Sequence, residues 1–236
     1  MNFKPSNYWL DTVQMPLGTP GSIPESADVA IVGAGFTGLS AARTLAKRGA
    51  KVAVLESHSI GWGASSRNGG MVLTGMKLSV ETLAARYGME ATRRMYAASI
   101  DSIDLVETII REEKIECDFS RCGHLEVASK QPHFDDYARS VEVIAREFNH
   151  RLRVVPRNAL GGEIGSGIYY GGIVDEASAG LNPARYVAGL GRSALEAGAH
   201  VFENAAVEQL EPSTHNGKSG FRLVASRGTI FANDVA

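Results

Sequence analysis

The sequence predicts an α/β fold, because a strand, a glycine-rich turn, a helix and a second strand follow one another over residues 27–56. Val29–Val32 is a short apolar run, typical of a strand that is buried on both faces of a parallel sheet. Gly33, Gly35 and Gly38 follow it with the spacing Gly-x-Gly-x-x-Gly. A buried strand, spaced glycines and a returning strand together indicate a βαβ dinucleotide-binding unit.

Each glycine of this turn has its own reason to be there. Gly33 allows the tight turn out of the strand, and Gly35 lacks the Cβ atom that would keep a diphosphate from the backbone. Gly38 lets the helix pack close to the sheet. Phe36 and Thr37 lie at the expected helix N-terminus, whose N–H groups and partial positive charge favour phosphate, so both are candidate cofactor contacts.

The helix and the second strand complete the unit. Apolar residues at helical spacing predict a face that packs on the sheet, and Gly49 ends the helix. Val52–Leu55 is the second strand, and Glu56 closes it with a carboxylate that can accept hydrogen bonds from ribose hydroxyls. An acid here favours FAD or NAD over NADP, and the adjoining Ser57 is a further candidate contact.

A second glycine-rich segment, Gly61–Met71, follows the ribose-binding strand. A loop of this composition can wrap a diphosphate and reach a flavin ring with backbone N–H groups. Arg67 adds a fixed positive charge, which is useful near phosphate or a reduced flavin anion. We expect the loop to contact phosphates and the ribityl chain through Ser65 and Ser66, and the flavin through Arg67, Asn68, Gly69 and Gly70.

The order Gly-Trp-Gly-Ala-Ser-Ser-Arg-Asn-Gly-Gly at residues 61–70 resembles the D-amino-acid-oxidase-type family of FAD-dependent oxidoreductases, in its γ-glutamylputrescine oxidoreductase-like branch. Tyr8–Thr12, Gly171–Asp175 and Gly180–Pro183 resemble the same branch, so the likeness spans essentially the whole chain. The resemblance implies a Rossmann-like FAD-binding domain of the glutathione-reductase type, with part of a second α+β substrate lobe.

The resemblance also implies an activity, the oxidation of the carbon–nitrogen bond of an amine or amino acid. Hydride would pass to flavin N5, and the imine product would be hydrolysed. In the family, the residue that matches Val207 contacts adenine through its backbone. Some relatives hold FAD covalently through a histidine at the position of Gly63, so we expect non-covalent FAD here. No catalytic residue is identified.

We expect four segments along the chain. Residues 1–26 form an N-terminal extension, 27–78 the βαβ unit and flavin loop, 79–174 part of the substrate lobe, and 175–236 the return to the FAD-binding domain. A new apolar strand is expected to begin at Asp234–Ala236, which predicts that a C-terminal half is missing and would be a partner of this piece.

Other elements follow from periodicity and turn residues. The apolar stripe of helix 132–149 is interpreted as core packing. Asn182-Pro183 is a helix start, and Asn216-Gly217 predicts a hairpin that pairs 207–211 with 221–225. The remaining expected elements are helices over 79–114, with a break at Gly88, and over 183–196, and strands at 123–129, 152–155, 167–174, 201–203 and 229–232.

Composition narrows the function classes. The net charge of −2, without a basic stripe, argues against nucleic acid. Apolar runs are short and the N-terminus lacks a signal-peptide pattern, which favours a cytoplasmic protein. Cys117 and Cys122 are not spaced as metal ligands and the six histidines are scattered, so no metal is expected. His58 is the histidine nearest the expected cofactor.

Two alternatives stay open from the sequence. The chain could be the non-catalytic FAD-binding half of a split or heteromeric flavoenzyme. An NAD-dependent dehydrogenase shares the βαβ unit but does not need the Arg67–Gly70 loop. The substrate could be any of several amines or amino acids, since the fold does not choose among them.

Overall fold

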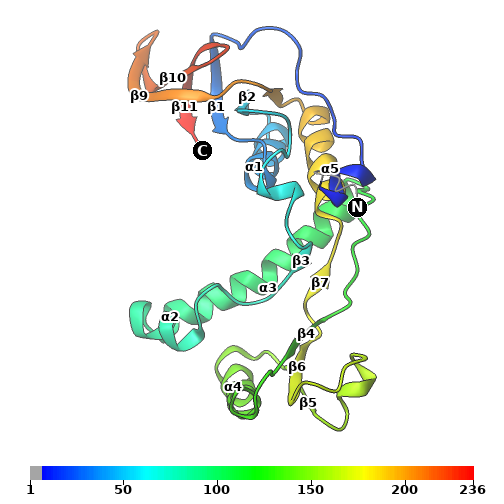
Figure 1. Cartoon of the computed structure of the whole chain (residues 1–236). Helices are drawn as coiled ribbons and strands as arrows, with labels where there is room; N and C mark the ends of the chain where they lie inside the picture. The colour runs from blue at the N-terminus through cyan, green and yellow to red at the C-terminus, as the bar shows by residue number, and fades with distance from the viewer. Residues whose placement is uncertain (1–6) are drawn as a thin grey trace. The chain divides into compact units, whose positions relative to one another are not determined.

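The computed structural model describes residues 7–236, which form two compact units (Figure 1). Unit 1 comprises the described residues up to Gly69, Glu112–Cys117 and Asn182–Ala236, and unit 2 comprises Gly70–Arg111 and Asp118–Leu181. The first six residues of the expected N-terminal extension lie outside the described part. The units divide after Gly69 and Leu181, whereas the sequence analysis placed these boundaries after residues 78 and 174.

Unit 1 is built on a six-stranded sheet. Its spatial order is β8 (His200–Phe202), β2 (Val52–Leu55), β1 (Ser26–Val32), β11 (Gly228–Val235), β10 (Lys218–Ala225) and β9 (Val207–His215). The first four strands of this order pair in parallel, and the last three form an antiparallel meander. A parallel βαβ unit at the centre of the sheet confirms the predicted fold class.

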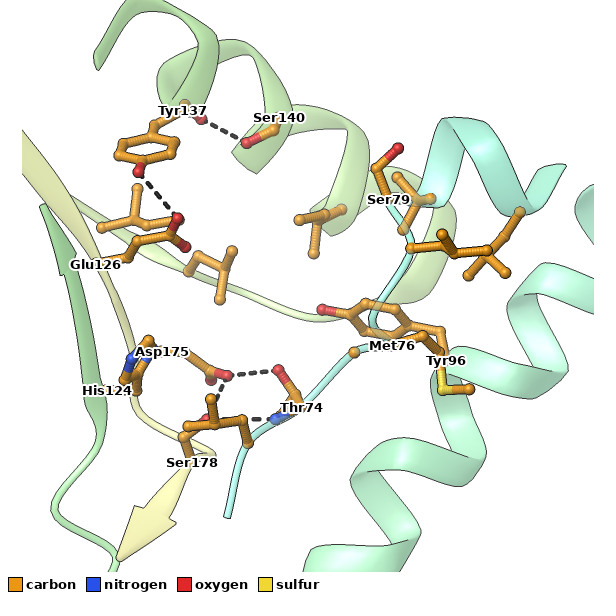
Figure 2. Close-up of a pocket in the computed structure, with 18 of the residues that line it drawn as sticks. Thr74, Met76, Ser79, Tyr96, His124, Glu126, Tyr137, Ser140, Asp175 and Ser178 are labelled. Carbon is orange, nitrogen blue, oxygen red and sulfur yellow. Dashed lines mark hydrogen bonds between the residues drawn. The ribbon is translucent and has the colours of Figure 1, made fainter. Parts of the chain in front are cut away.

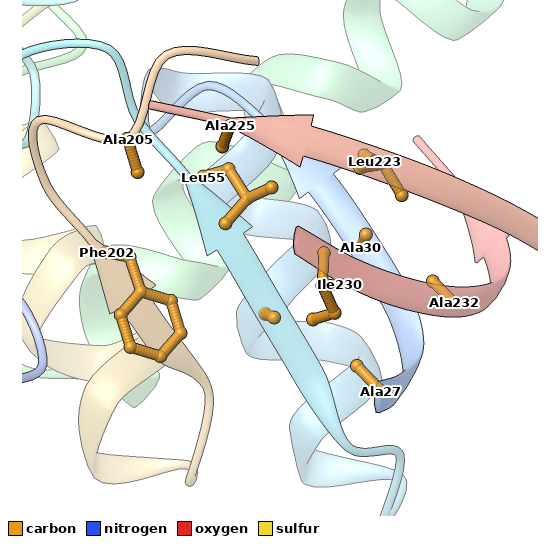
Figure 3. Close-up of a cluster of buried hydrophobic side chains, with 10 residues drawn as sticks. Ala27, Ala30, Leu55, Phe202, Ala205, Leu223, Ala225, Ile230 and Ala232 are labelled. Carbon is orange, nitrogen blue, oxygen red and sulfur yellow. The ribbon is translucent and has the colours of Figure 1, made fainter. Parts of the chain in front are cut away.

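Both faces of the central strands are covered. All four residues of β2 are buried, as the run of apolar residues predicts. Ala53 and Leu55 join side chains of β1, β8, β10 and β11 in one apolar cluster (Figure 3). Ile31 lies on the helix side of β1, since a Cβ atom added at Gly38 would be 3.2 Å from its Cγ2 atom. The sheet therefore supports the glycine turn rigidly.

Two helices pack against each other in unit 1, α1 (Phe36–Lys47) and α5 (Pro183–Glu196). The Oδ1 atom of Asn182 accepts a hydrogen bond from Arg185 N at 3.1 Å, which confirms the predicted N-cap ahead of Pro183. Ten residues of α5 are buried, and its glycines permit close packing. A Cβ atom at Gly189 would lie 2.3 Å from Ile115 Cγ2, so Glu112–Cys117 packs tightly on this helix.

The predicted hairpin is present and pairs the predicted segments, with a shift in register between Val224 and Ala225. Glu211 pairs with Arg222, and Val207 pairs with Ala225. Asn216 and Gly217 connect the strands with φ angles of 51° and 76°. Positive φ at both central residues is what a tight hairpin turn requires, because it matches the right-handed twist of the strands.

The end of the chain differs from expectation. No separate strand begins at Asp234 in the described structure, because β11 runs without interruption from Gly228 to Val235. Its first half pairs antiparallel with β10, while Phe231–Val235 pairs in parallel with Ser26–Ala30 of β1. One strand thus makes both the last turn of the meander and the return to the parallel sheet.

Unit 2 holds an antiparallel sheet of three strands, in the order β4 (His124–Val127), β6 (Gly171–Asp175), β5 (Arg153–Pro156). A second, two-stranded sheet pairs β3 (Met71–Val72) with β7 (Ala179–Gly180). The helices are α2 (Val80–Tyr87), α3 (Met89–Glu112) and α4 (Gln131–Phe148), with the break at Gly88 as predicted. Short 3₁₀ turns occupy Tyr8–Thr12 and Ala64–Ser66 of unit 1, and Leu160–Gly162 of unit 2.

The stripe of α4 is less buried than predicted. No residue of α4 is fully buried, although Phe134 packs on β6, where a Cβ atom at Gly171 would lie 2.4 Å from its ring. Tyr137 and Ile144 of the same stripe line a cavity instead of filling a core. Over residues 7–236, no helix has the length and apolar character needed to cross a membrane.

Gly38→Ala tests the constraint on the glycine turn. The new Cβ atom would lie 2.0 Å from the Gly33 carbonyl oxygen, so the helix and turn must separate. We expect the free energy of unfolding to fall by about 1–3 kcal/mol or more, the usual range for overpacking, in urea denaturation. Gly63→Ala is the control, because its Cβ atom would meet nothing within 4 Å. Equal stability of both variants would contradict this reading.

Candidate functional site

The turn after β1 and the start of α1 hold predicted cofactor contacts close together. Gly33 has φ +100°, a conformation that residues with a side chain rarely adopt, and a Cβ atom added there would meet nothing within 4 Å. Gly35 is the N-cap of α1 and has no side chain to cap the helix. Phe36 and Thr37 form the first turn of α1, with Thr37 exposed to solvent. The positive end of the helix dipole therefore lies at a turn that carries no side chain at Gly33 or Gly35, which suits a diphosphate.

Glu56 lies beside this turn, at the end of β2. Its Oε2 atom accepts a hydrogen bond from Ala34 N at 2.7 Å, and its Oε1 atom accepts from His58 N at 2.9 Å. The Ser57 hydroxyl donates to the same Oε1 atom at 3.1 Å. The acid at the end of the second strand thus reaches the glycine turn of the first, as a ribose-binding carboxylate must.

The loop after Glu56 folds back onto the helix N-terminus. The Ser65 hydroxyl oxygen accepts a hydrogen bond from Phe36 N at 3.1 Å, across 29 positions of sequence. Gly35 is needed for this contact, because a Cβ atom there would lie 2.9 Å from Ser65 Oγ. Gly61 anchors the start of the loop by donating its N–H to the Ala34 carbonyl at 3.0 Å. The predicted turn and the predicted loop therefore form one surface.

Arg67 is held by an aromatic stack that the sequence analysis missed. The rings of His58 and Trp62 are parallel, with centroids 3.9 Å apart, and the Arg67 guanidinium carbon lies 4.6 Å from the Trp62 ring centroid. Cation–π attraction of this kind favours a fixed position for the guanidinium. His58, singled out as the histidine nearest the cofactor, thus acts by stacking on Trp62. The Trp-x-x-x-x-Arg spacing was the signal available in the sequence.

The remaining predicted residues differ in their exposure and in the contacts they make. The Asn68 amide nitrogen donates to the carbonyls of Ala64 and Ser65 at 3.1 and 3.2 Å, so it shapes the loop. Gly69 is exposed and Gly70 is buried, with its carbonyl accepting from Leu181 N at 2.9 Å. Val207 lies at the start of β9, packed against the apolar cluster of the sheet.

The residues present fit FAD. Ser66 is completely buried, and its hydroxyl has no hydrogen-bond partner in the described structure. A buried hydroxyl without a partner is costly, and a phosphate or ribityl oxygen of the cofactor would satisfy it. The glycine turn leaves room for a diphosphate, and Glu56 offers acceptors for ribose hydroxyls. Arg67 supplies positive charge for the anionic cofactor.

Unit 2 contains a cavity of about 350 Å³ that the sequence analysis did not predict (Figure 2). Side chains of the loop 73–79, α2, α3, α4 and the three-stranded sheet line it. Its walls are largely apolar, with carboxylates at Glu81, Glu126 and Asp175 and no lysine or arginine among the lining residues. The volume is in the range of small-molecule pockets.

The two tyrosines on the cavity wall have raised pKa values. Burial, together with a hydrogen bond at 2.9 Å to the Glu126 carboxylate, raises the pKa of Tyr137 to about 12. Burial also raises the pKa of Tyr96, although a hydrogen bond with Thr74 opposes the shift. Both phenols are therefore neutral hydrogen-bond donors at physiological pH.

Of the two cysteines, Cys117 is buried and Cys122 is exposed. Residues 7–236 contain no cluster of three or more side chains able to hold a metal ion.

Comparison of the sequence with known proteins identifies a matching family and two similar relatives. Residues 28–235 match the sequence family described as FAD dependent oxidoreductase. The chain is 33% identical over 184 residues to a probable oxidoreductase, OrdL, of Haemophilus influenzae, covering 78% of this chain and 42% of the relative. It is 31% identical over 189 residues to γ-glutamylputrescine oxidoreductase of Escherichia coli, covering 80% and 44%. The chain thus spans about half the length of these relatives.

Solved structures share the fold. Glycine oxidase from Geobacillus kaustophilus superposes with a TM-score of 0.72 at 23% identity, over 90% of this chain and 55% of that protein. L-Amino acid deaminase from Proteus myxofaciens superposes with a TM-score of 0.76 at 20% identity, over 94% and 47%. At these identities the likeness concerns the fold.

Gly35→Ala tests whether the turn receives a diphosphate. The methyl group would occupy the backbone surface at the helix N-terminus and also push against the Ser65 hydroxyl. We expect stable FAD binding to be lost with little change in the unfolding temperature, measured by flavin absorbance after gel filtration. Gly63→Ala, in the same loop without a nearby atom, is the control and keeps its FAD.

A double variant separates the two effects. In Gly35→Ala/Ser65→Ala the contact with the hydroxyl is gone, while the methyl group still blocks the phosphate position. We expect FAD binding to stay lost. Full recovery of binding in the double variant would show that only the Ser65 contact mattered, and would remove Gly35 from the diphosphate site.

Proposed function

The chain belongs to the family of FAD-dependent oxidoreductases, and from this premise we propose that the protein oxidises the carbon–nitrogen bond of an amine or amino acid. The observation that carries the proposal is the single surface formed by the turn Gly33–Gly38, Glu56 and the loop at Ser65. Such a surface serves a dinucleotide cofactor, and the family supplies its identity as FAD.

The substrate class comes from a relative. One protein that is 31% identical over 80% of this chain is named γ-glutamylputrescine oxidoreductase. That name denotes an amine as the substrate of that protein. Because this chain spans less than half of that relative, the activity proposed is that of the whole protein. The proposal leaves open what reoxidises the flavin, because an oxidase that uses oxygen and an FAD-dependent dehydrogenase that uses another acceptor share the same amine-oxidising half-reaction.

We assign the cofactor contacts as follows. Gly33, Gly35 and Gly38 face the diphosphate, together with the first turn of α1 at Phe36 and Thr37. Glu56 and Ser57 bind the adenosine ribose, and the Val207 backbone contacts adenine. Ser65 and Ser66 bind the phosphates and the ribityl chain, while Arg67–Gly70 lie against the flavin. Gly63 has no nucleophilic side chain, so the cofactor is held without a covalent bond at this position.

FAD held by these residues would serve as the electron acceptor for a hydride from the carbon next to the amine nitrogen, and water would hydrolyse the resulting imine. The protein itself binds the cofactor and the substrate, orients them toward each other and tunes the flavin ring. The Arg67 guanidinium, held by the Trp62 ring, provides a fixed positive charge that would stabilise the negative charge developing on the flavin when the flavin is reduced. A neutral amine is needed at the reacting carbon, and apolar surroundings favour the neutral form.

The structure argues against one alternative function and leaves the other to experiment. An NAD-dependent dehydrogenase has no need of the 61–70 loop, whose Ser65 is fastened to the helix N-terminus here. A non-catalytic FAD-binding half of a larger enzyme keeps the same cofactor site, so only turnover distinguishes it from the proposed enzyme.

Glu56→Gln tests the ribose assignment. The amide keeps the size of the side chain but loses the charge that strengthens its hydrogen bonds to Ala34 N, His58 N and the ribose. We expect the binding free energy of FAD to weaken by about 1–3 kcal/mol in a fluorescence titration. Glu196→Gln, an exposed carboxylate at the end of α5, is the control. An unchanged dissociation constant would remove Glu56 from the site.

Anaerobic reduction tests the activity. The full-length protein, purified with its flavin, is mixed with a panel of primary and secondary amines and amino acids, and the visible flavin absorbance is followed. We expect at least one amine to bleach the flavin, with the matching imine-derived carbonyl product detected by mass spectrometry. Chemical reduction by dithionite without reduction by any amine would instead favour the non-catalytic FAD-binding function.

A further inference from the structure

The turn between β8 and β9 runs beside the segment that carries the proposed ribose contacts. Glu56 donates its N–H to the Phe202 carbonyl at 3.0 Å, and its own carbonyl accepts from Ala205 N at 2.7 Å. Two residues further on, the His58 carbonyl accepts from Asn204 N at 2.8 Å. Figure 3 shows Phe202 and Ala205 at the two ends of this turn. Backbone hydrogen bonds therefore fasten the segment from Glu56 to His58.

The Glu203 side chain continues this pairing beyond the last backbone contact. Its Oε1 atom accepts a hydrogen bond from Ile60 N at 2.8 Å, across 143 positions of sequence. Ile60 is 1% exposed, so water has little access to it and its N–H depends on a partner from the protein. The charge of a carboxylate makes this hydrogen bond stronger than one to a carbonyl. Contacts at Glu56, His58 and Ile60 thus fix every second residue of the segment.

The same carboxylate also binds the segment that precedes the βαβ unit. Its Oε2 atom accepts from Gly18 N at 3.1 Å, across 185 positions. Next in the chain, Thr19 N donates to the Val201 carbonyl at 2.6 Å, and Val201 N donates to the Thr19 hydroxyl at 2.9 Å. These contacts lay residues 18–19 along β8, the outermost strand of the sheet on this side. A Cβ atom at Gly18 would lie 2.6 Å from the Val201 carbonyl oxygen, so glycine permits the approach.

Helix α5 supports both of the segments that the carboxylate binds. The side chains of Ile60 and Pro16 lie against it at Gly191, where an added Cβ atom would be 3.1 Å from a carbon of each. The adjoining Gly61 packs on the same helix, since a Cβ atom there would lie 2.7 Å from Val187 Cγ1. Apolar packing thus fixes the side chain of Ile60, while the hydrogen bond to the carboxylate fixes its backbone.

The backbone at Ile60 connects the two rings of the stack that holds Arg67. His58 lies two residues before Ile60 and Trp62 two residues after it, and their rings are parallel at 3.9 Å. The Trp62 side chain, on which the Arg67 guanidinium lies, is 46% exposed, so surrounding side chains restrain it only in part. A shift of the backbone at Ile60 would therefore move one ring relative to the other and displace Arg67.

We propose that Glu203 is a positioning residue of the cofactor site, whose carboxylate fixes the backbone at Ile60 and thereby the stack that holds Arg67 against the flavin. The same carboxylate makes residues 16–19 part of the support of this site, although they precede the region 28–235 that matches the family. The inference rests on the proposed function, through the assignment of Arg67 to the flavin. All of these residues belong to unit 1.

The test uses the full-length protein and two variants of Glu203. Glu203→Gln keeps the length of the side chain, but its amide nitrogen cannot accept a hydrogen bond, so one of the two backbone N–H groups loses its partner. Glu203→Ala removes both hydrogen bonds. Glu113→Gln is the matched control: Glu113 is another carboxylate of unit 1, and its partners Arg43 and Lys47 lie in the second half of α1, away from the helix N-terminus.

Amide hydrogen exchange without added FAD tests the structural part of the proposal. It is followed in the peptides that cover Gly18 and Ile60. For Glu203→Ala we expect exchange in both peptides to rise about 10-fold or more, the factor that corresponds to the loss of one charge-assisted hydrogen bond. Glu203→Gln is expected to change in the same direction by a smaller factor, and Glu113→Gln to leave both peptides as in the wild type.

The dissociation constant of FAD and the reduction potential of the bound flavin test the positioning role. For Glu203→Ala we expect FAD to bind about 10-fold more weakly, in line with the loss of a fixed loop contact. We also expect a more negative potential, because a displaced Arg67 stabilises the reduced flavin anion less. A residue with a merely structural role would not move the potential, and Glu113→Gln is expected to keep the wild-type affinity and potential.

Three outcomes would overturn the proposal. Unchanged exchange at Ile60 in Glu203→Ala would show that the carboxylate does not hold this backbone. Faster exchange with wild-type affinity and potential would show that the stack is positioned without Glu203. Equal losses of affinity and potential in Glu113→Gln would show that a general loss of stability explains the effect. If Glu203→Ala does not fold, Glu203→Gln decides by the same criteria. Failure of the proposed function is distinct, because then the wild-type protein itself binds no FAD or is not reduced by amines.

Discussion

The close approach of helix α1 to the turn after β1 is the constraint on which the cofactor unit depends. A Cβ atom at Gly38 would lie 2.0 Å from the Gly33 carbonyl oxygen, so only glycine lets the helix begin where it does. The helix therefore begins beside the turn. There, Ala34 N donates to the Glu56 carboxylate and Phe36 N donates to the Ser65 hydroxyl. Strand, turn, acid and loop are brought together because the helix starts so close to the sheet.

The hydrogen bonds of this surface show how a loop of small, polar residues acquires a fixed shape. Glycine-rich segments lose much conformational entropy on ordering, and few apolar contacts compensate for it here. The compensation comes from specific contacts instead: the Ser65 hydroxyl, the Asn68 amide and the stack of Arg67 on Trp62. The buried Ser66 hydroxyl stays without a partner, which marks the place where a cofactor oxygen would complete the network.

Much of this arrangement could be predicted from the sequence. The bounds of β2, the N-cap at Asn182 and the hairpin turn at Asn216-Gly217 agree with the structure, because each depends on residues near one another in the chain. Where partners are far apart in sequence, prediction was weaker. The strand at the C-terminus was expected to begin at Asp234, but pairing with both β10 and β1 makes it one strand from Gly228.

By itself, the sequence determined the period of each element and the chemistry of each turn, and hence the βαβ unit and its candidate cofactor residues. Only the tertiary structure decided which side chains meet across long separations. Asp175 and Thr74 lie 101 positions apart, and Ser65 and Phe36 lie 29 apart. The α4 stripe likewise has an apolar period, yet Tyr137 and Ile144 line a cavity. The physical reason is that periodicity specifies which face of an element is apolar, while packing between elements decides what that face contacts.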